Sequence, residues 1–126
     1  MQSPPVPELP LALYEAASKG LWPPVKAWLE GPDGDIDLTE GEHRATLLIG
    51  AALHGKVSIV DSLLQRGADV HPSSKQGCTA LIAAAARGHA RVLERLLLFR
   101  PDLSAVFSTT RGDKYTALQL AQRNLP

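Results

Sequence analysis

The side chains best able to do chemistry in this chain of 126 residues are four histidines and one cysteine. Metal ligands must converge at set spacings, such as i and i+4 along one helix, and none of His43, His54, His71 and His89 pair in that way. We therefore expect no metal site. Cys78 precedes a predicted helix, where the helix dipole could activate the thiol as a nucleophile. The alternative, which we favour, is a loop cysteine without special reactivity.

Glycines and acidic residues offer no binding loop either. Gly31, Gly34, Gly41 and Gly112 lie in turn-rich stretches and match neither phosphate-binding pattern. The acidic residues of 33–42 lack the spacing of a twelve-residue calcium loop, and we interpret that run as a solvated loop. We therefore expect no cofactor and no enzymatic activity.

Composition restricts the partners and the compartment. The chain has 13 basic and 13 acidic residues, which argues against nucleic acid or an anionic membrane as an electrostatically driven partner. The start of the chain lacks the basic and apolar regions of a signal peptide, and no stretch approaches eighteen consecutive apolar residues. A single cysteine excludes an internal disulfide and is compatible with a reducing compartment. We expect an intracellular protein, cytoplasmic or nuclear.

The elements that must carry any site are pairs of short helices, seen best in residues 77–100. Residues 79–87 are rich in alanine, the best helix former. Residues 91–99 place Val92, Leu93, Leu96 and Leu97 at the spacing of one helix face. Gly88 lies between the two segments, where a helix can end in left-handed backbone. The pattern predicts two antiparallel helices.

This helix pair recurs along the chain. Residues 11–30 and 46–65 show the same arrangement, and residues 116–121 repeat the first half of it. Gly20, Gly55 and Gly88 recur at nearly equal intervals, and Thr46 and Thr79 are spaced as Gly55 and Gly88 are. A fixed period of roughly 33 residues is typical of a repeat solenoid.

The repeated pattern resembles the ankyrin repeat. The pattern of that family is matched in one copy by Gly77, Thr79, Leu81, Ala84, Ala85, Gly88, His89, Leu93, Leu96 and Leu97, and the preceding copy closes with Gly67, Ala68, Asp69 and Val70. The resemblance implies an all-α repeat solenoid of stacked helix–turn–helix repeats with projecting hairpin loops. It divides the chain into an extended proline-rich lead-in (1–10), an N-terminal capping repeat (11–38), two repeats (39–71 and 72–104) and a C-terminal half repeat (105–126). Cys78 takes a variable loop position in this pattern.

Departures from the family pattern lead to further expectations. Ankyrin helices usually open with Thr-Pro-Leu-His, but the proline and histidine are absent in all three internal copies, so the stack should lose some polar contacts between repeats. Because the last copy is half a repeat, Leu97, Leu98 and Phe99 should be partly exposed. Trp28 takes a core position and should be buried, whereas Trp22 should be the more exposed of the two tryptophans.

The resemblance implies a protein–protein interaction module or adaptor that binds a partner protein or peptide through its concave face. The positions that map to this face and to the hairpin tips are Glu42, His43, Ala45, Leu53, His54, Lys75, Gln76, Cys78, Ala86, Arg87, Asp113 and Tyr115. The alternative is the recognition domain of a larger signalling protein or enzyme. We expect a monomer, with self-association through the incompletely covered C-terminal end as the other option. His71 stands where an asparaginyl hydroxylase modifies ankyrin hairpins, and its hydroxylation is a further hypothesis.

Overall fold

A computed structural model describes residues 7–32, 34–41, 44–75, 77–99, 106–108 and 113–123 of the chain. Within these residues the elements in chain order are α1 (Leu11–Lys19), α2 (Trp22–Leu29), α3 (Leu47–Leu53), α4 (Val57–Gln65), α5 (Ala80–Arg87), α6 (Ala90–Leu97), β1 (Val106–Ser108), β2 (Lys114–Thr116) and α7 (Ala117–Arg123). The two strands form an antiparallel hairpin in which Phe107 pairs with Tyr115.

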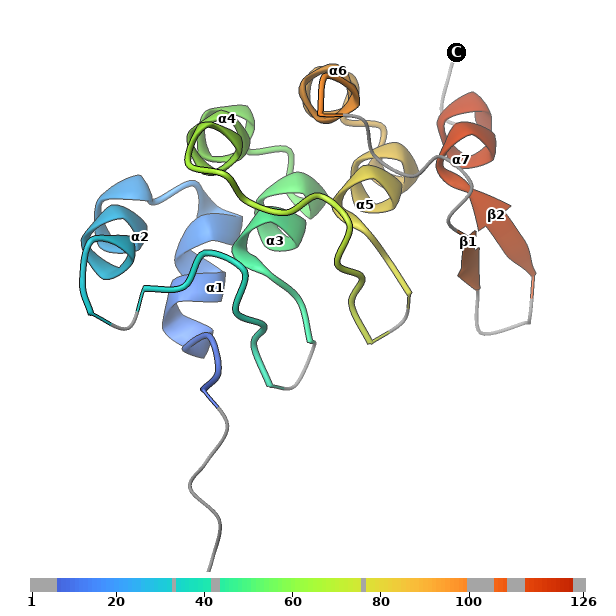
Figure 1. Cartoon of the computed structure of the whole chain (residues 1–126). Helices are drawn as coiled ribbons and strands as arrows, with labels where there is room; N and C mark the ends of the chain where they lie inside the picture. The colour runs from blue at the N-terminus through green and yellow to red at the C-terminus, as the bar shows by residue number, and fades with distance from the viewer. Residues whose placement is uncertain are drawn as a thin grey trace, which may run out of the picture.

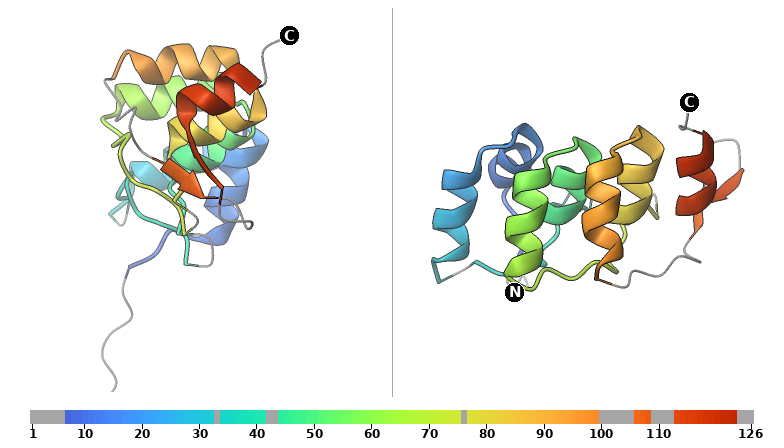
Figure 2. Two further views of the ribbon diagram at one scale, coloured as in Figure 1. Left: turned by 90° about the vertical axis from the view of Figure 1, so that its right-hand side faces the viewer. Right: turned by 90° about the horizontal axis from the view of Figure 1, so that it is seen from above.

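The helices stack in two rows, as Figures 1 and 2 show. The inner row is α1, α3, α5 and α7, and each of these helices packs against the next one in the row. The outer row is α2, α4 and α6, and each outer helix packs on the inner helix that precedes it in the chain. The loops that follow α2 and α4 and the β1–β2 hairpin project from the same side of the stack (Figure 1). The prediction of an all-α repeat solenoid with projecting hairpin loops is confirmed.

Threonine side chains cap the first turns of α3, α5 and α7. The side-chain oxygens of Thr46 and Thr79 accept hydrogen bonds of 3.2 Å from the backbone N–H groups of Ile49 and Ile82. Thr116 does the same for Gln119 at 3.3 Å, and the Gln119 side chain accepts a bond of 2.9 Å from the Thr116 N–H. Each bond satisfies a donor that the first turn of a helix leaves without a partner. The threonine period therefore records where α3, α5 and α7 begin, whereas α1 begins after Pro10 without a side-chain cap.

Small residues allow the inner helices to approach closely. The repeated alanine pairs of α1, α3 and α5 are buried, and those of α3 and α5 are fully inaccessible. In α3, Gly50 faces α1 so closely that a Cβ atom there would lie 2.8 Å from Cε2 of the Tyr14 ring. The Tyr14 ring occupies the space where a side chain at position 50 would lie. The two helices can therefore pack this closely only because residue 50 is glycine.

A histidine in the turn between α5 and α6 provides a polar contact between repeats. The Nε2 of His89 donates to the backbone carbonyl of Leu53 at 3.1 Å. The same ring lies against Gly55, whose φ of 68° suits glycine and where a Cβ would come within 2.6 Å of the His89 Nδ1. His89 thus links its own repeat to the end of α3 in the preceding repeat.

At the N-terminal end the structure adds one contact and corrects one prediction. Leu9, within the proline-rich stretch, is buried, and its N–H donates to the carbonyl of Thr39 at 2.9 Å. Trp28 is only half-buried, so the prediction of a buried Trp28 is wrong, and Trp22 is half-buried as well. The physical reason is that α2 is the first outer helix and packs mainly on α1. Arg66 follows the last residue of α4, and its guanidinium lies over the Trp22 ring, 5.4 Å from the ring centroid.

Removal of one threonine cap should destabilise the whole stack measurably. Thr79→Ala leaves the Ile82 N–H without its acceptor, and we expect the free energy of unfolding to fall by about 1 kcal/mol relative to Thr79→Ser, which keeps the hydroxyl. Urea titration followed by far-UV circular dichroism measures the difference. Equal midpoints for the Ser and Ala variants would show that the hydroxyl does not stabilise α5.

Candidate functional site

Most of the residues predicted to form the binding face are accessible where the structure describes them. His54, Lys75, Ala86, Arg87 and Asp113 are exposed, whereas Leu53, Cys78 and Tyr115 are half-buried. Glu42, His43 and Gln76 lie outside the described residues.

Ala45 does not lie on the binding face, and its prediction as a contact residue is wrong. It is buried, with 1% of its surface exposed. The cause is local, because its carbonyl accepts a hydrogen bond of 3.0 Å from the N–H of Glu40. This bond draws the segment before the Thr46 cap into the stack, and the Ala45 methyl group packs in the core.

The centre of the face is formed by the carboxyl ends of two neighbouring inner helices. Leu53 and His54 end α3, and Ala86 and Arg87 occupy the same positions of the next repeat, at the end of α5. Since α3 packs directly on α5, these four residues occupy equivalent positions on neighbouring helices. We call this group the central patch.

Charges on the central patch act on one another. The pKa of His54 is lowered by burial first and then by the positive charges of Arg87, Lys56 and His89. The lowered pKa favours the neutral form of His54, and Arg87 carries the positive charge of the patch. In the described part of the chain Arg87 forms no ion pair. A partner that supplies a carboxylate here would meet an exposed cation.

Cys78 lacks the properties of an activated nucleophile. Burial raises the pKa of its thiol to about 11, although the Arg87 charge acts in the opposite direction. The thiol lies 3.6 Å from the carbonyl oxygen of Thr79, to which it donates. Burial therefore outweighs any effect of the α5 dipole on this thiol, and a loop cysteine without special reactivity is the better interpretation.

Tyr115 is less available as a contact residue than its aromatic character suggested. It lies in β2, is half-buried and packs against the core. The guanidinium of Arg123, from α7, stands 4.9 Å from its ring centroid. Because this pair joins β2 to α7, a change at Tyr115 would disturb the last repeat as well as the surface.

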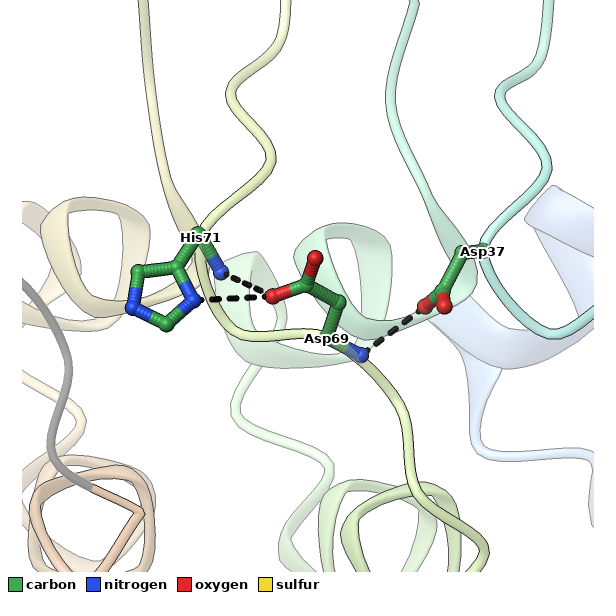
Figure 3. Close-up of polar contacts among 3 residues, drawn as sticks. All are labelled: Asp37, Asp69 and His71. Atoms are coloured by element: carbon green, nitrogen blue, oxygen red, sulfur yellow. Dashed lines mark hydrogen bonds and ion pairs between the residues drawn. The ribbon is translucent and has the colours of Figure 1, made fainter.

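Two carboxylates, Asp37 and Asp69, join the bases of successive loops, and the sequence pattern did not predict this contact. The N–H of Asp69 donates to the carboxylate of Asp37 at 2.8 Å, and Asp69 in turn accepts from the backbone N–H and the ring of His71, at 3.0 and 2.9 Å (Figure 3). The His71 backbone N–H first, and then its ring, lower the pKa of Asp69. Asp37 and Asp69 lie almost one repeat period apart, which is the signal that could have identified them. His71 is exposed, and its hydroxylation stays a prediction.

Glu40 shows that the acidic run of 33–42 is not uniformly a solvated loop. Only 5% of its surface is exposed. Its carbonyl accepts from the N–H of Arg44 at 2.7 Å. The pKa of Tyr14 is raised first by burial of its own hydroxyl and then by the negative charge of Glu40. Sequence pattern alone does not distinguish this glutamate from its exposed neighbours.

One hollow lies away from the central patch, at the N-terminal end. It has a volume of about 720 Å³ and is lined by Pro7, Glu8, Pro10, Trp28, Pro32, Gly34, Asp35 and Leu38. Across the described ranges, no three His, Cys, Asp or Glu side chains come together as metal ligands would. None of the helices described has the length and apolar character needed to cross a bilayer.

Comparison with known proteins agrees with the stacked architecture. Residues 48–97 match the family model described as ankyrin repeats (many copies). A stretch of 54 residues is 48% identical to a protein of Oryza sativa subsp. japonica named probable E3 ubiquitin-protein ligase XBOS33. The match covers 43% of this chain and 10% of that protein, so the chain spans about a tenth of the relative's length. Residues 48–97 therefore match ankyrin repeats, as the sequence pattern indicated.

The Cys78 thiol should react slowly in the folded protein. With a pKa of about 11 in place of 9.0, the thiolate fraction at pH 8, and with it the rate of alkylation by iodoacetamide, should be about 100-fold lower than in the urea-unfolded chain. The raised pKa also means that the thiol's contribution to stability is complete below pH 9.0 and is lost as the pH rises through about 11. Faster alkylation of the native protein than of the unfolded chain would contradict this interpretation.

Proposed function

We propose that this chain is a non-catalytic protein–protein interaction module, or adaptor, that binds a partner protein or peptide through its concave face. Ankyrin repeats are in general modules of protein interaction, and the match over residues 48–97 supports that class. The observation that carries the proposal is the central patch. There the exposed Arg87 lies close enough to lower the pKa of His54, and Leu53, which precedes His54, is half-buried.

The chemistry of the patch suggests the kind of segment that it binds. Arg87 can form a bidentate hydrogen bond with a carboxylate, and Leu53 offers apolar surface next to it. Lys56 adds a second positive charge close enough to influence His54. We therefore propose a partner segment that combines an Asp or Glu with an apolar side chain. With 13 basic and 13 acidic residues overall, neither nucleic acid nor a membrane is proposed as the partner.

The second candidate is a recognition domain within a larger signalling protein or enzyme. It is favoured by the similarity of 54 residues to part of a much longer protein named as a probable E3 ubiquitin-protein ligase. Both candidates assign the same task to the described residues, which is recognition of another protein. We propose that this task is carried out inside the cell by a monomer.

Reversal of one charge in the central patch should remove partner binding without loss of the fold. We expect Arg87→Glu to reduce affinity by about tenfold or more, because truncated or reversed arginine anchors commonly cost above about 1 kcal/mol. Proteins captured by the intact chain from a cell extract and quantified by mass spectrometry identify the partner, and titration calorimetry then measures its affinity. Tyr115 is left unaltered because it packs on the last repeat.

Arg91→Glu is the matched control, since Arg91 is also exposed but lies on the outer helix α6. It makes the same change of charge outside the concave face and should bind as the unaltered chain does. Thermal unfolding should be alike for both variants. Equal retention of the partner by Arg87→Glu and by the unaltered chain would refute the concave-face proposal.

A further inference from the structure

The hollow at the N-terminal end has walls that backbone hydrogen bonds hold in place. One wall belongs to residues 7–10, where the buried Leu9 donates its N–H to the carbonyl of Thr39 at 2.9 Å. A second wall belongs to the loop after α2, which turns through a hydrogen bond of 3.3 Å from the Gly34 N–H to the carbonyl of Gly31. The volume of about 720 Å³ lies within the roughly 300–1,000 Å³ of pockets that hold small ligands. The hollow is therefore formed in the unbound chain.

Trp28 gives the hollow an aromatic wall. Its counterparts in the next two outer helices, Leu63 and Leu96, are fully inaccessible to solvent, whereas Trp28 is only half-buried. Part of the larger tryptophan ring therefore lies outside the core, where a ligand in the hollow can contact it.

The carboxylates of Glu8 and Asp35 give the hollow a negative charge. Both residues line it, and both are exposed. The Oδ1 of Asp35 accepts from the N–H of Asp37 at 3.0 Å, which orients this carboxylate, and a carboxylate can accept several further hydrogen bonds. Residues 30–42 include six acidic residues and no basic one. A ligand that combines a positive charge with an apolar stem complements both the charge and the aromatic wall.

The other tryptophan of α2 shows how this fold pairs an arginine with a tryptophan and a carboxylate. The Arg66 guanidinium lies 5.4 Å from the Trp22 ring centroid and 3.6 Å from the Glu30 carboxylate. Tryptophan is the aromatic side chain that attracts a cation most strongly. Over the Trp28 ring, by contrast, the part of the chain that the structure describes places no arginine or lysine. Arg66 lines a smaller neighbouring hollow together with Asp35, but it does not line the larger one.

We propose that this hollow binds an arginine side chain from a segment of a partner protein, with the guanidinium between the Trp28 ring and the carboxylates of Glu8 and Asp35. The arrangement repeats that of Arg66 at Trp22, with the arginine supplied by the partner. Arginine suits the site better than lysine, because its planar guanidinium stacks on an aromatic ring and bonds two carboxylate oxygens at once. An apolar residue next to this arginine packs on the prolines that line the hollow. Residues 1–6 contain no arginine or lysine, so they do not supply this side chain.

A peptide titration on the whole 126-residue chain tests the proposal. The probe is a short capped peptide with the central sequence Leu-Arg-Pro-Leu, and two-dimensional NMR follows the indole N–H signals of the two tryptophans. The Trp28 signal should move saturably, whereas the signal of Trp22, which Arg66 already covers, should not. A second peptide has citrulline in place of arginine, which keeps the shape and removes the charge. It should bind about tenfold more weakly.

Substitutions in the hollow test the ring and the charges separately. Trp28→Leu introduces the residue that the two later outer helices have at this position, so the core is kept. It should weaken binding about fivefold, followed by the amide signal of Gly34. Glu8→Gln and Asp35→Asn should each weaken binding about threefold, because each removes one charge and keeps the shape. Glu94→Gln, at an exposed carboxylate on α6, is the matched control and should bind unchanged.

Three results would each overturn the proposal. They are a Trp28 signal that does not move saturably, equal binding of the citrulline peptide, and an affinity of Trp28→Leu equal to that of the unaltered chain. Sedimentation that shows a dimer dissociated by the peptide would also overturn it, since a second copy would then supply the arginine. Arg87→Glu should bind the peptide as the unaltered chain does, because this site lies away from the central patch and does not depend on the function proposed there.

Discussion

The structure depends on one constraint, which is that a short helix pair cannot bury both of its faces by itself. Each inner helix here is lined with alanine or glycine and is covered on both sides only where a neighbouring repeat is present. Small side chains let the backbones come close, and the larger Leu, Ile and Val residues fill the space between the rows. Stability is therefore shared between neighbours along the stack, as in other linear repeat proteins.

Polar groups set the register of the stack that apolar burial holds together. The threonine hydroxyls determine where α3, α5 and α7 begin. His89 joins one turn to the carboxyl end of the preceding inner helix, and Asp37 and Asp69 join the loops at their bases. Because each of these bonds connects positions one repeat apart or fixes a helix start, an insertion of one residue would break several of them together.

The exposed side chains of the central patch differ in burial from the loop residues that maintain the stack. The pattern assigned Ala45, Glu40 and Cys78 to surface loops. Ala45 and Glu40 are buried, and Cys78 is buried enough to raise the pKa of its thiol. The central patch lies at the ends of inner helices, where a side chain can point into solvent while the core stays covered. In the function we propose, these few side chains carry recognition, and the helices behind them hold their positions.

The sequence by itself determined the repeat, the helix pairs and the positions of the threonine caps, because these follow from local propensity and from a fixed repeat period. It also determined that Leu97, Leu98 and Phe99 would be exposed, since the last copy of the pattern is half a repeat. Only the tertiary structure decided that Ala45 and Glu40 are buried, that Trp28 is half-buried and that His89 bonds to Leu53. These outcomes depend on which segment of a neighbouring repeat lies against each residue, and a pattern within one repeat carries no record of that contact.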